Sequence, residues 1–172
     1  MRKVEVLPYN KQWPDMFQLE ADLLKEVLGA EILDIYHIGS TAIEGLHAKP
    51  IIDIMPVVKN ITTVDSYNEE MIAIRYEPKG ENGIKNRRFF QKGGNNRSHH
   101  VHIYERYNPE IVRHLAFRDY LRKYPLEAKQ YGDRKIVLAK QYAFDINSYI
   151  KGKEKMVKEM EQRALIWHEH IR

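Results

Sequence analysis

The sequence predicts a protein of the α/β (α+β) class, with a mixed β-sheet early in the chain and flanking helices. Two short apolar runs, 32–38 and 50–58, indicate buried strands, and the second is continuously apolar except for Asp53. A continuous apolar run is typical of a strand that other layers cover on both faces. From Asn108 onward the pattern becomes helical. We therefore expect a helical C-terminal half that follows a layered, sheet-containing part.

The remaining elements of the first half have local signals. Apolar residues at helical spacing predict a helix over 14–28, which ends at Gly29. A short helix is expected over 60–72 and a strand over 72–76. Two antiparallel strands, 87–92 and 98–104, are joined by a Gly-Gly-Asn-Asn turn.

Three helices are expected in the second half. Asn108-Pro109-Glu110 has the composition of a helix start, with a cap, a proline and an early acid. Pro125 opens a second helix that runs to about Tyr142. Asp145 or Asn147 could cap the last helix, whose apolar stripe we interpret as core: Met156, Met160, Ala164, Trp167 and Ile171.

Length and composition exclude several classes of protein. A chain of 172 residues without repeats or a low-complexity linker fits one domain over 1–172, with a sheet-rich part at about 1–106 and a helical part at about 107–172. The absence of cysteine excludes disulfides, thiolate metal sites and a cysteine nucleophile. Neither a signal peptide nor an apolar run of roughly 20 residues is present, so we expect a cytoplasmic protein without a membrane partner.

The net charge of +4 is modest and partly concentrated. Five basic residues and no acidic residue lie between Lys85 and Arg97. This segment is interpreted either as a solvated hairpin face or as a phosphate-binding surface. Nucleic acid is not the expected partner, because the charge excess is small and no nucleic-acid-binding motif is present.

The segment 36–55, YHIGSTAIEGLHAKPIIDIM, carries the sharpest chemical signal. Gly39 lets the backbone approach a phosphate, and the hydroxyls of Ser40 and Thr41 can donate to phosphate oxygens. Lys49 could neutralise charge nearby. Asp53 on the following strand could hold Mg²⁺ or Mn²⁺ together with a substrate phosphate. The structural alternative is a Gly-Ser turn and a lone capping aspartate.

Further candidates lie in the predicted hairpin. His100 and His102 are two residues apart, so they point to the same face of their strand. With Asp53 they could hold a transition metal such as Zn, because imidazole suits such ions, or one of them could act as a general base. Solvated histidines on a surface strand are the alternative. Arg88, with Phe89-Phe90 behind it, is a candidate phosphate clamp.

These residues resemble those of a known superfamily. Ile38-Gly39-Ser40 followed by Asp53-Ile54 has the order found in nucleotidyltransferases of the DNA polymerase β type. More closely, the chain resembles the GrpB family, which has this fold and is also found fused to dephospho-CoA kinase. The resemblance covers nearly the whole chain and rests on these segments: Tyr9 to Trp13, Phe17, HIGSTAIEGL at 37–46, AKPIIDI at 48–54, Arg88-Phe89-Phe90, HVHI at 100–103, HLAFRDYLR at 114–122, Tyr131 and Lys135.

The resemblance implies a nucleotidyltransferase-like fold and a nucleotide or another phosphate-containing small molecule as ligand. Active superfamily members carry two acids, two residues apart, on the second strand, whereas this chain has Asp53 and then Met55. The sequence is therefore compatible with two functions. One is transfer of a nucleotidyl group to a small molecule or protein, and the alternative is a non-catalytic module that binds a nucleotide or a coenzyme A-related ligand, or assists a partner.

Overall fold

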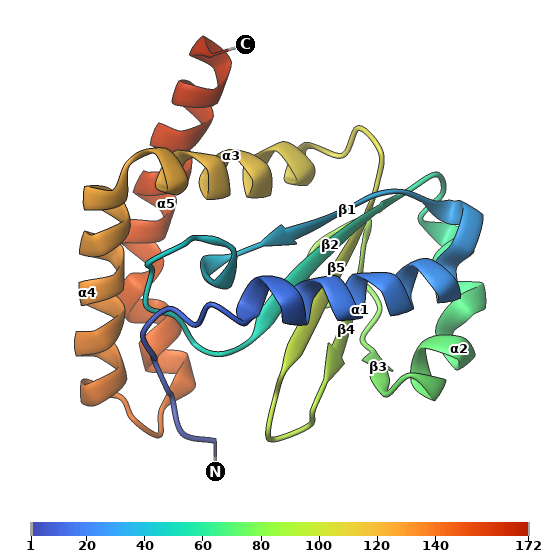
Figure 1. The fold of residues 1–172 in the computed structure, drawn as a ribbon, viewed down its shortest axis with the longest axis horizontal. Helices are drawn as coiled ribbons and strands as arrows, with labels where there is room; N and C mark the ends of the chain where they lie inside the picture. Colours follow the sequence, from blue (N-terminus) through green and yellow to red (C-terminus); the bar gives the residue numbers. More distant parts are fainter. Residues whose placement is uncertain (1, 172) are drawn as a thin grey trace. The chain divides into compact units, whose positions relative to one another are not determined.

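A computed structural model describes residues 2–171 (Figure 1). Within them the strands form a five-stranded sheet of order β1-β2-β5-β4-β3. The β2–β5 pair is parallel and the other pairs are antiparallel, so the predicted mixed sheet is confirmed. The strand bounds are β1 Ile32–Ile38, β2 Ile52–Val58, β3 Tyr76–Pro78, β4 Arg87–Lys92 and β5 His99–Glu105.

The helices also follow the predicted order. Their bounds are α1 Trp13–Leu28, α2 Asn68–Ala73, α3 Pro109–Lys123, α4 Pro125–Gln141 and α5 Ile146–His170, with 3₁₀ turns at Gly29–Glu31, Ser40–Ala42 and Thr62–Tyr67. Two predicted caps are present. Asn108 Oδ1 accepts a hydrogen bond from the Glu110 amide at 2.9 Å, and Asp145 Oδ1 accepts one from the Ser148 amide at 3.1 Å. No helix within 2–171 is long and apolar enough to cross a membrane.

The chain folds into two compact units. Among the described residues, the first unit comprises 2–11, 39–50 and 112–171, and the second comprises 12–38 and 51–111. The second unit holds the sheet, and the first holds most of the C-terminal helices. The chain passes between the units more than once, so their boundaries do not follow the simple division at about residue 106 that the sequence suggested.

The sheet of the second unit has two different faces because side chains alternate along each strand. Helix α1 packs across one of them (Figure 1). There Phe17 stacks on His37 with ring centroids 4.8 Å apart. Ile54, the register partner of both His37 and Val101, shares this apolar face. Asp53, one residue earlier, therefore points to the opposite face.

The first unit is organised around packed helices. Its α4 and α5 lie side by side (Figure 1). The main cluster of buried residues comprises Ile43, Leu46, Ala116, Tyr120, Leu121, Ala128, Tyr131, Met160 and Ala164. Met160 and Ala164 belong to the predicted stripe of the last helix, and Met156 and Trp167 pack against the cluster. Ile171 lies beyond the helix and is 57% exposed, so the core part of the stripe ends before it.

The prediction of a strand over 72–76 is wrong. Ile72 and Ala73 are the last residues of α2, and the strand starts only at Tyr76. Between them Arg75 adopts a φ of 74°, which turns the chain out of the helix before the strand begins. The helix predicted over 60–72 is a 3₁₀ turn followed by α2.

Candidate functional site

Asp53, His100 and His102 come together on the sheet face opposite α1. Asp53 on β2 is the register partner of His100 on β5, and His102 follows two residues later on the same face. Asp53 Oδ1 lies 3.0 Å from His102 Nε2 and 3.6 Å from His100 Nδ1. The three side chains are 26%, 23% and 14% exposed in the order Asp53, His100, His102, so the group is half-buried and open to a small ligand.

Two arginines lie on the far sides of these imidazole rings. Arg87 Nη1 is 3.4 Å from His102 Nδ1, and Arg97 Nη1 is 3.2 Å from His100 Nε2. A guanidinium is only a donor, so the ring nitrogen facing it accepts and the other ring nitrogen carries the proton. In this arrangement each ring accepts from an arginine on one side and turns its N–H group toward Asp53 on the other.

These contacts set the protonation state of Asp53. Burial alone would raise the pKa of its carboxyl, but the hydrogen bonds from His100 and His102 outweigh burial and hold that pKa far below its usual range. Asp53 is therefore a carboxylate at neutral pH. Phe89 packs against both rings, at centroid distances of 5.3 Å to His100 and 5.2 Å to His102, and forms the apolar wall of the site.

The side chains of this cluster suit a metal ion. One carboxylate oxygen and two imidazole nitrogens lie within 4.8 Å of one another. Met55 shares the face of Asp53, is fully buried, and supplies no hard ligand. A set of one oxygen and two nitrogens suits Zn, Mn or Fe better than Mg. Arg87 and Arg97 oppose metal binding. When one nitrogen of an imidazole binds a metal, the other carries the proton, and here that other nitrogen faces a guanidinium that can only donate.

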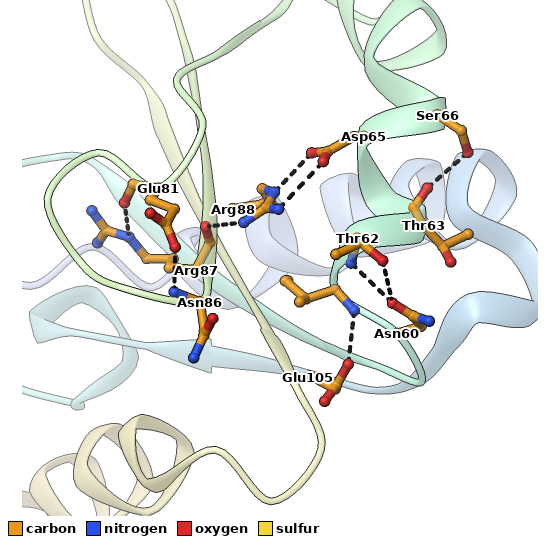
Figure 2. A network of polar contacts seen from close by, with 11 residues as sticks. Asn60, Thr62, Thr63, Asp65, Ser66, Glu81, Asn86, Arg87, Arg88 and Glu105 are labelled. Carbon is orange, nitrogen blue, oxygen red and sulfur yellow. Dashed lines mark hydrogen bonds and ion pairs between the residues drawn. The ribbon is translucent and has the colours of Figure 1, made fainter.

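Arg88, the predicted phosphate clamp, binds another side chain in this structure. Its Nε and Nη2 donate to the two carboxylate oxygens of Asp65 at 2.7 and 3.3 Å (Figure 2). Its neighbour Arg87 is the arginine that reaches the histidines. The Arg87 guanidinium is also held by the backbone carbonyls of Glu81 and Asn82, at 3.1 and 2.8 Å.

The basic segment 85–97 is therefore not simply a solvated hairpin face. Lys92 forms an ion pair with Glu20 of α1, and Arg97 Nε donates to the Gly94 carbonyl at 3.1 Å. Four of the five side chains thus make contacts within the second unit, and two of them, Arg88 and Lys92, form ion pairs there. Lys85 is the exposed member.

Arg87 and Arg97 were not singled out as site residues by the sequence. The signal that could have identified Arg87 is the strand register: Phe89 pairs with His102 across β4 and β5, and Arg87 shares its face. That register depends on the length of the connecting turn, which composition does not fix. Arg97 lies in the turn itself, where no strand periodicity applies.

The predicted phosphate-binding residues of the segment 39–49 belong to the first unit. Gly39 has a φ of 73°, a conformation that favours glycine, and it precedes the 3₁₀ turn that carries Ser40 and Thr41. Arg122 Nε and Nη2 donate to the carbonyl of Ala42 at 2.9 and 2.8 Å and so fix the end of that turn. Thr41 is buried, while Ser40 and Lys49 are half-buried.

Comparison with known proteins identifies close relatives. The family model described as GrpB protein matches residues 3–163. The crystal structure of conserved protein GrpB from Enterococcus faecalis superposes with a TM-score of 0.93 at 42% identity, covering 95% of this chain and 99% of that one. UPF0157 protein YqkA of Bacillus subtilis is 52% identical over 96% of this chain, and the match spans 48% of its own length.

Other matches are more distant. A dephospho-CoA kinase of Mycolicibacterium paratuberculosis is 25% identical over 95% of this chain and 46% of its own length, as the resemblance to a fused family implied. The Cid1 poly(U) polymerase has a TM-score of 0.49 at 17% identity, which covers 76% of this chain and 45% of that one. The chain thus spans about half the length of YqkA and of these longer proteins.

Proposed function

The chain belongs to the GrpB family, and from that premise we propose that it binds a nucleotide or another phosphate ester beside a divalent metal held by Asp53, His100 and His102. The observation that carries the proposal is the convergence of these three side chains within 4.8 Å on one face of the sheet. The donor set favours Mn²⁺ or Zn²⁺ over Mg²⁺. When bound, the ion would supply positive charge to a phosphate oxygen.

The reaction that fits this site is transfer of a nucleotidyl group to a small molecule or protein. The acceptor's hydroxyl oxygen attacks the α-phosphorus, and the bond between that phosphorus and the pyrophosphate oxygen breaks. The hydroxyl proton passes to water, or to His100 or His102 in the alternative in which that ring does not hold the ion, and pyrophosphate leaves. Gly39, Ser40, Thr41 and Lys49, which belong to the first unit, are proposed separately as contacts for a phosphate group.

Phosphate contact by Arg88 remains part of the proposal only if Asp65 releases it. The bidentate contact with Asp65 occupies Nε and Nη2 of Arg88, so a phosphate would have to compete with this carboxylate for them. Arg88→Ala therefore weakens nucleotide binding only if the ligand displaces Asp65.

A direct test is calorimetric titration of the protein with Mn²⁺, Zn²⁺ and Mg²⁺, followed by ATP, GTP, CTP and UTP in the presence of each ion. We expect Mn²⁺ or Zn²⁺ binding at one site and nucleotide binding that depends on it. Asp53→Asn should abolish the metal binding. Asp34→Asn, which removes an exposed carboxylate of the neighbouring strand β1, is the matched control and should bind as the parent does. Equal metal binding by both variants, or none by the parent, contradicts the proposal.

The second candidate function is a non-catalytic binding module. Met55 favours it, because a buried methionine stands where the superfamily pattern has its second acid. The two candidates differ in turnover. Release of pyrophosphate from a bound nucleotide, lost in Asp53→Asn, supports the transferase, whereas saturable nucleotide binding without pyrophosphate supports the binding module.

A further inference from the structure

A buried lysine of the first unit lies against the 3₁₀ turn Ser40–Ala42. Lys135 of α4 is only 2% exposed, and its Nζ donates a hydrogen bond to Ser40 Oγ at 2.9 Å. The same Nζ lies 4.3 Å from the centroid of the Tyr131 ring. A buried lysine usually has a carboxylate partner, because desolvating an ammonium is costly. Here the partners are a hydroxyl and an aromatic face, which compensate only part of that cost.

Two more lysines surround this position. Lys49 and Lys153 each place Nζ 5.4 Å from the centroid of the Tyr149 ring. Lys153 Nζ also donates to the Tyr131 hydroxyl at 3.4 Å. After burial, the charges of Lys153 and Lys49 are the influences that lower the pKa of Lys135. Three lysine ammonium groups therefore gather over two tyrosine rings, and their charges repel one another.

A polar atom without a partner lies in the same cluster. The Tyr149 side chain is fully buried, and its hydroxyl has no hydrogen-bond partner among residues 2–171. Buried polar groups are nearly always hydrogen-bonded, so an unsatisfied one requires an explanation such as a ligand or an ion. Burial also raises the pKa of Tyr149, which keeps the hydroxyl protonated and able to donate.

We propose that Lys49, Lys135 and Lys153, with Ser40 Oγ and the Tyr149 hydroxyl, form a binding site for a phosphate group. A phosphate oxygen accepts from both ammonium and hydroxyl donors, and its negative charge offsets the repulsion among the lysines. Ser40, Lys49 and Lys153 are half-buried and give access from solvent, whereas Lys135 and Tyr149 form the floor. The inference rests on the proposed function in taking the ligand to be a phosphate ester, and it requires neither a metal nor Asp53.

Lys153 and Lys158 offer a matched pair of variants on helix α5. Lys153 belongs to the cluster, whereas Lys158 makes an exposed ion pair with Glu154 at 2.9 Å, one helical turn away. Lys153→Met removes one charge-assisted contact with the ligand, so we expect its tripolyphosphate affinity to fall about tenfold or more. Lys158→Met should bind as the parent does. Lys135→Met should abolish binding, and its melting temperature without ligand reports whether it folds.

The experiment is calorimetric titration in EDTA at low salt, with tripolyphosphate, ATP and adenosine as probes. Tripolyphosphate and ATP should bind the parent protein, and adenosine should not. No tripolyphosphate binding, equal weakening by Lys153→Met and Lys158→Met, or adenosine binding as tight as that of ATP would overturn the inference.

The same titration distinguishes the lysine phosphate site from the proposed metal-dependent nucleotide site. Asp53→Asn should bind tripolyphosphate as the parent does, because the lysine cluster lies in the other unit. Tripolyphosphate binding with no binding of any nucleotide would contradict the proposed nucleotide ligand but support the phosphate site. Metal-dependent nucleotide binding without any binding of tripolyphosphate in EDTA would support the proposed function and overturn the lysine site.

Discussion

Arg87 and Asp53 lie on opposite sides of the His102 ring: Arg87 Nη1 is 3.4 Å from Nδ1, and Asp53 Oδ1 is 3.0 Å from Nε2. Because the guanidinium can only donate, this arrangement places the ring proton on Nε2, where a metal would have to bind. A metal at Nε2 displaces that proton and requires one at Nδ1, which then faces a donor. Arg87 therefore opposes a bare metal ion while favouring an anion beside it.

Arg87→Met should consequently bind free Mn²⁺ or Zn²⁺ more tightly than the parent. We expect a gain of about tenfold, since a hydrogen bond to a charged group is worth roughly 1.5 kcal/mol or more. Calorimetric titration measures it. Arg88→Met is the control, because Arg88 contacts Asp65 rather than the histidines. A weaker metal affinity in Arg87→Met than in Arg88→Met would mean that Arg87 supports the metal instead.

Met55→Asp would restore a second carboxylate on the face of Asp53. Met55 is fully buried, so the new charge should destabilise the protein without metal, by about 3 kcal/mol. Mg²⁺ should recover part of this loss, because hard carboxylate ligands suit that ion. Thermal unfolding with and without Mg²⁺ measures both effects. Met55→Leu, which keeps volume and polarity, should show neither, and an equal response of the two variants to Mg²⁺ would contradict the prediction.

The core of the site was predictable because it follows from strand periodicity. Asp53 is the lone acid in an apolar run, and His100 and His102 are spaced to share a face. What links them is the parallel pairing of β2 with β5, which residue patterns did not fix. Gly39, Ser40, Thr41 and Lys49 keep their predicted role in phosphate binding as a proposal.

The less predictable features depend on contacts between distant segments. Arg88 and Asp65 are 23 residues apart, and the sequence shows no periodicity that joins them. Lys135 and Ser40 are 95 residues apart, and the sequence did not predict that they meet; Lys135 was noted only as one of the residues that match the family. Such pairs result from packing, and local propensity carries no information about them.

Removal of the buried Glu20 carboxylate should lower the free energy of unfolding. Its carboxylate accepts from the Tyr76 hydroxyl at 2.9 Å and pairs with Lys92, and His99 Nε2 lies 3.9 Å away. Glu20→Ala leaves the Lys92 ammonium without its carboxylate at 17% exposure, which should cost about 3 kcal/mol or more. Urea unfolding measures the loss.

The control is Glu77→Ala, which removes an exposed partner of Lys79 and should leave the unfolding midpoint almost unchanged. Similar midpoints for Glu20→Ala and Glu77→Ala would show that the buried network of Glu20 contributes little to the stability of the fold.

Lys135 should make stability rise with pH in the alkaline range. Burial first, and then the charges of Lys153 and Lys49, hold the pKa of Lys135 well below its ordinary value of 10.5. Between the lowered folded value and 10.5 the unfolded chain binds the proton and the folded chain does not, so the free energy of unfolding increases with pH there. Below that window the buried ammonium destabilises the fold by a constant amount.

Lys135→Met removes this dependence, and its urea midpoints between about pH 7 and 10 should rise less than those of the parent. Lys158→Met, with its exposed ion pair, should follow the parent. Tripolyphosphate should flatten the parent's curve as well, because a bound anion stabilises the protonated amine and shifts the pKa of Lys135 back toward its ordinary value. Parallel curves for the parent and Lys135→Met would mean that the amine keeps its proton throughout this range, and that the hydroxyl of Ser40 and the ring of Tyr131 suffice to hold it.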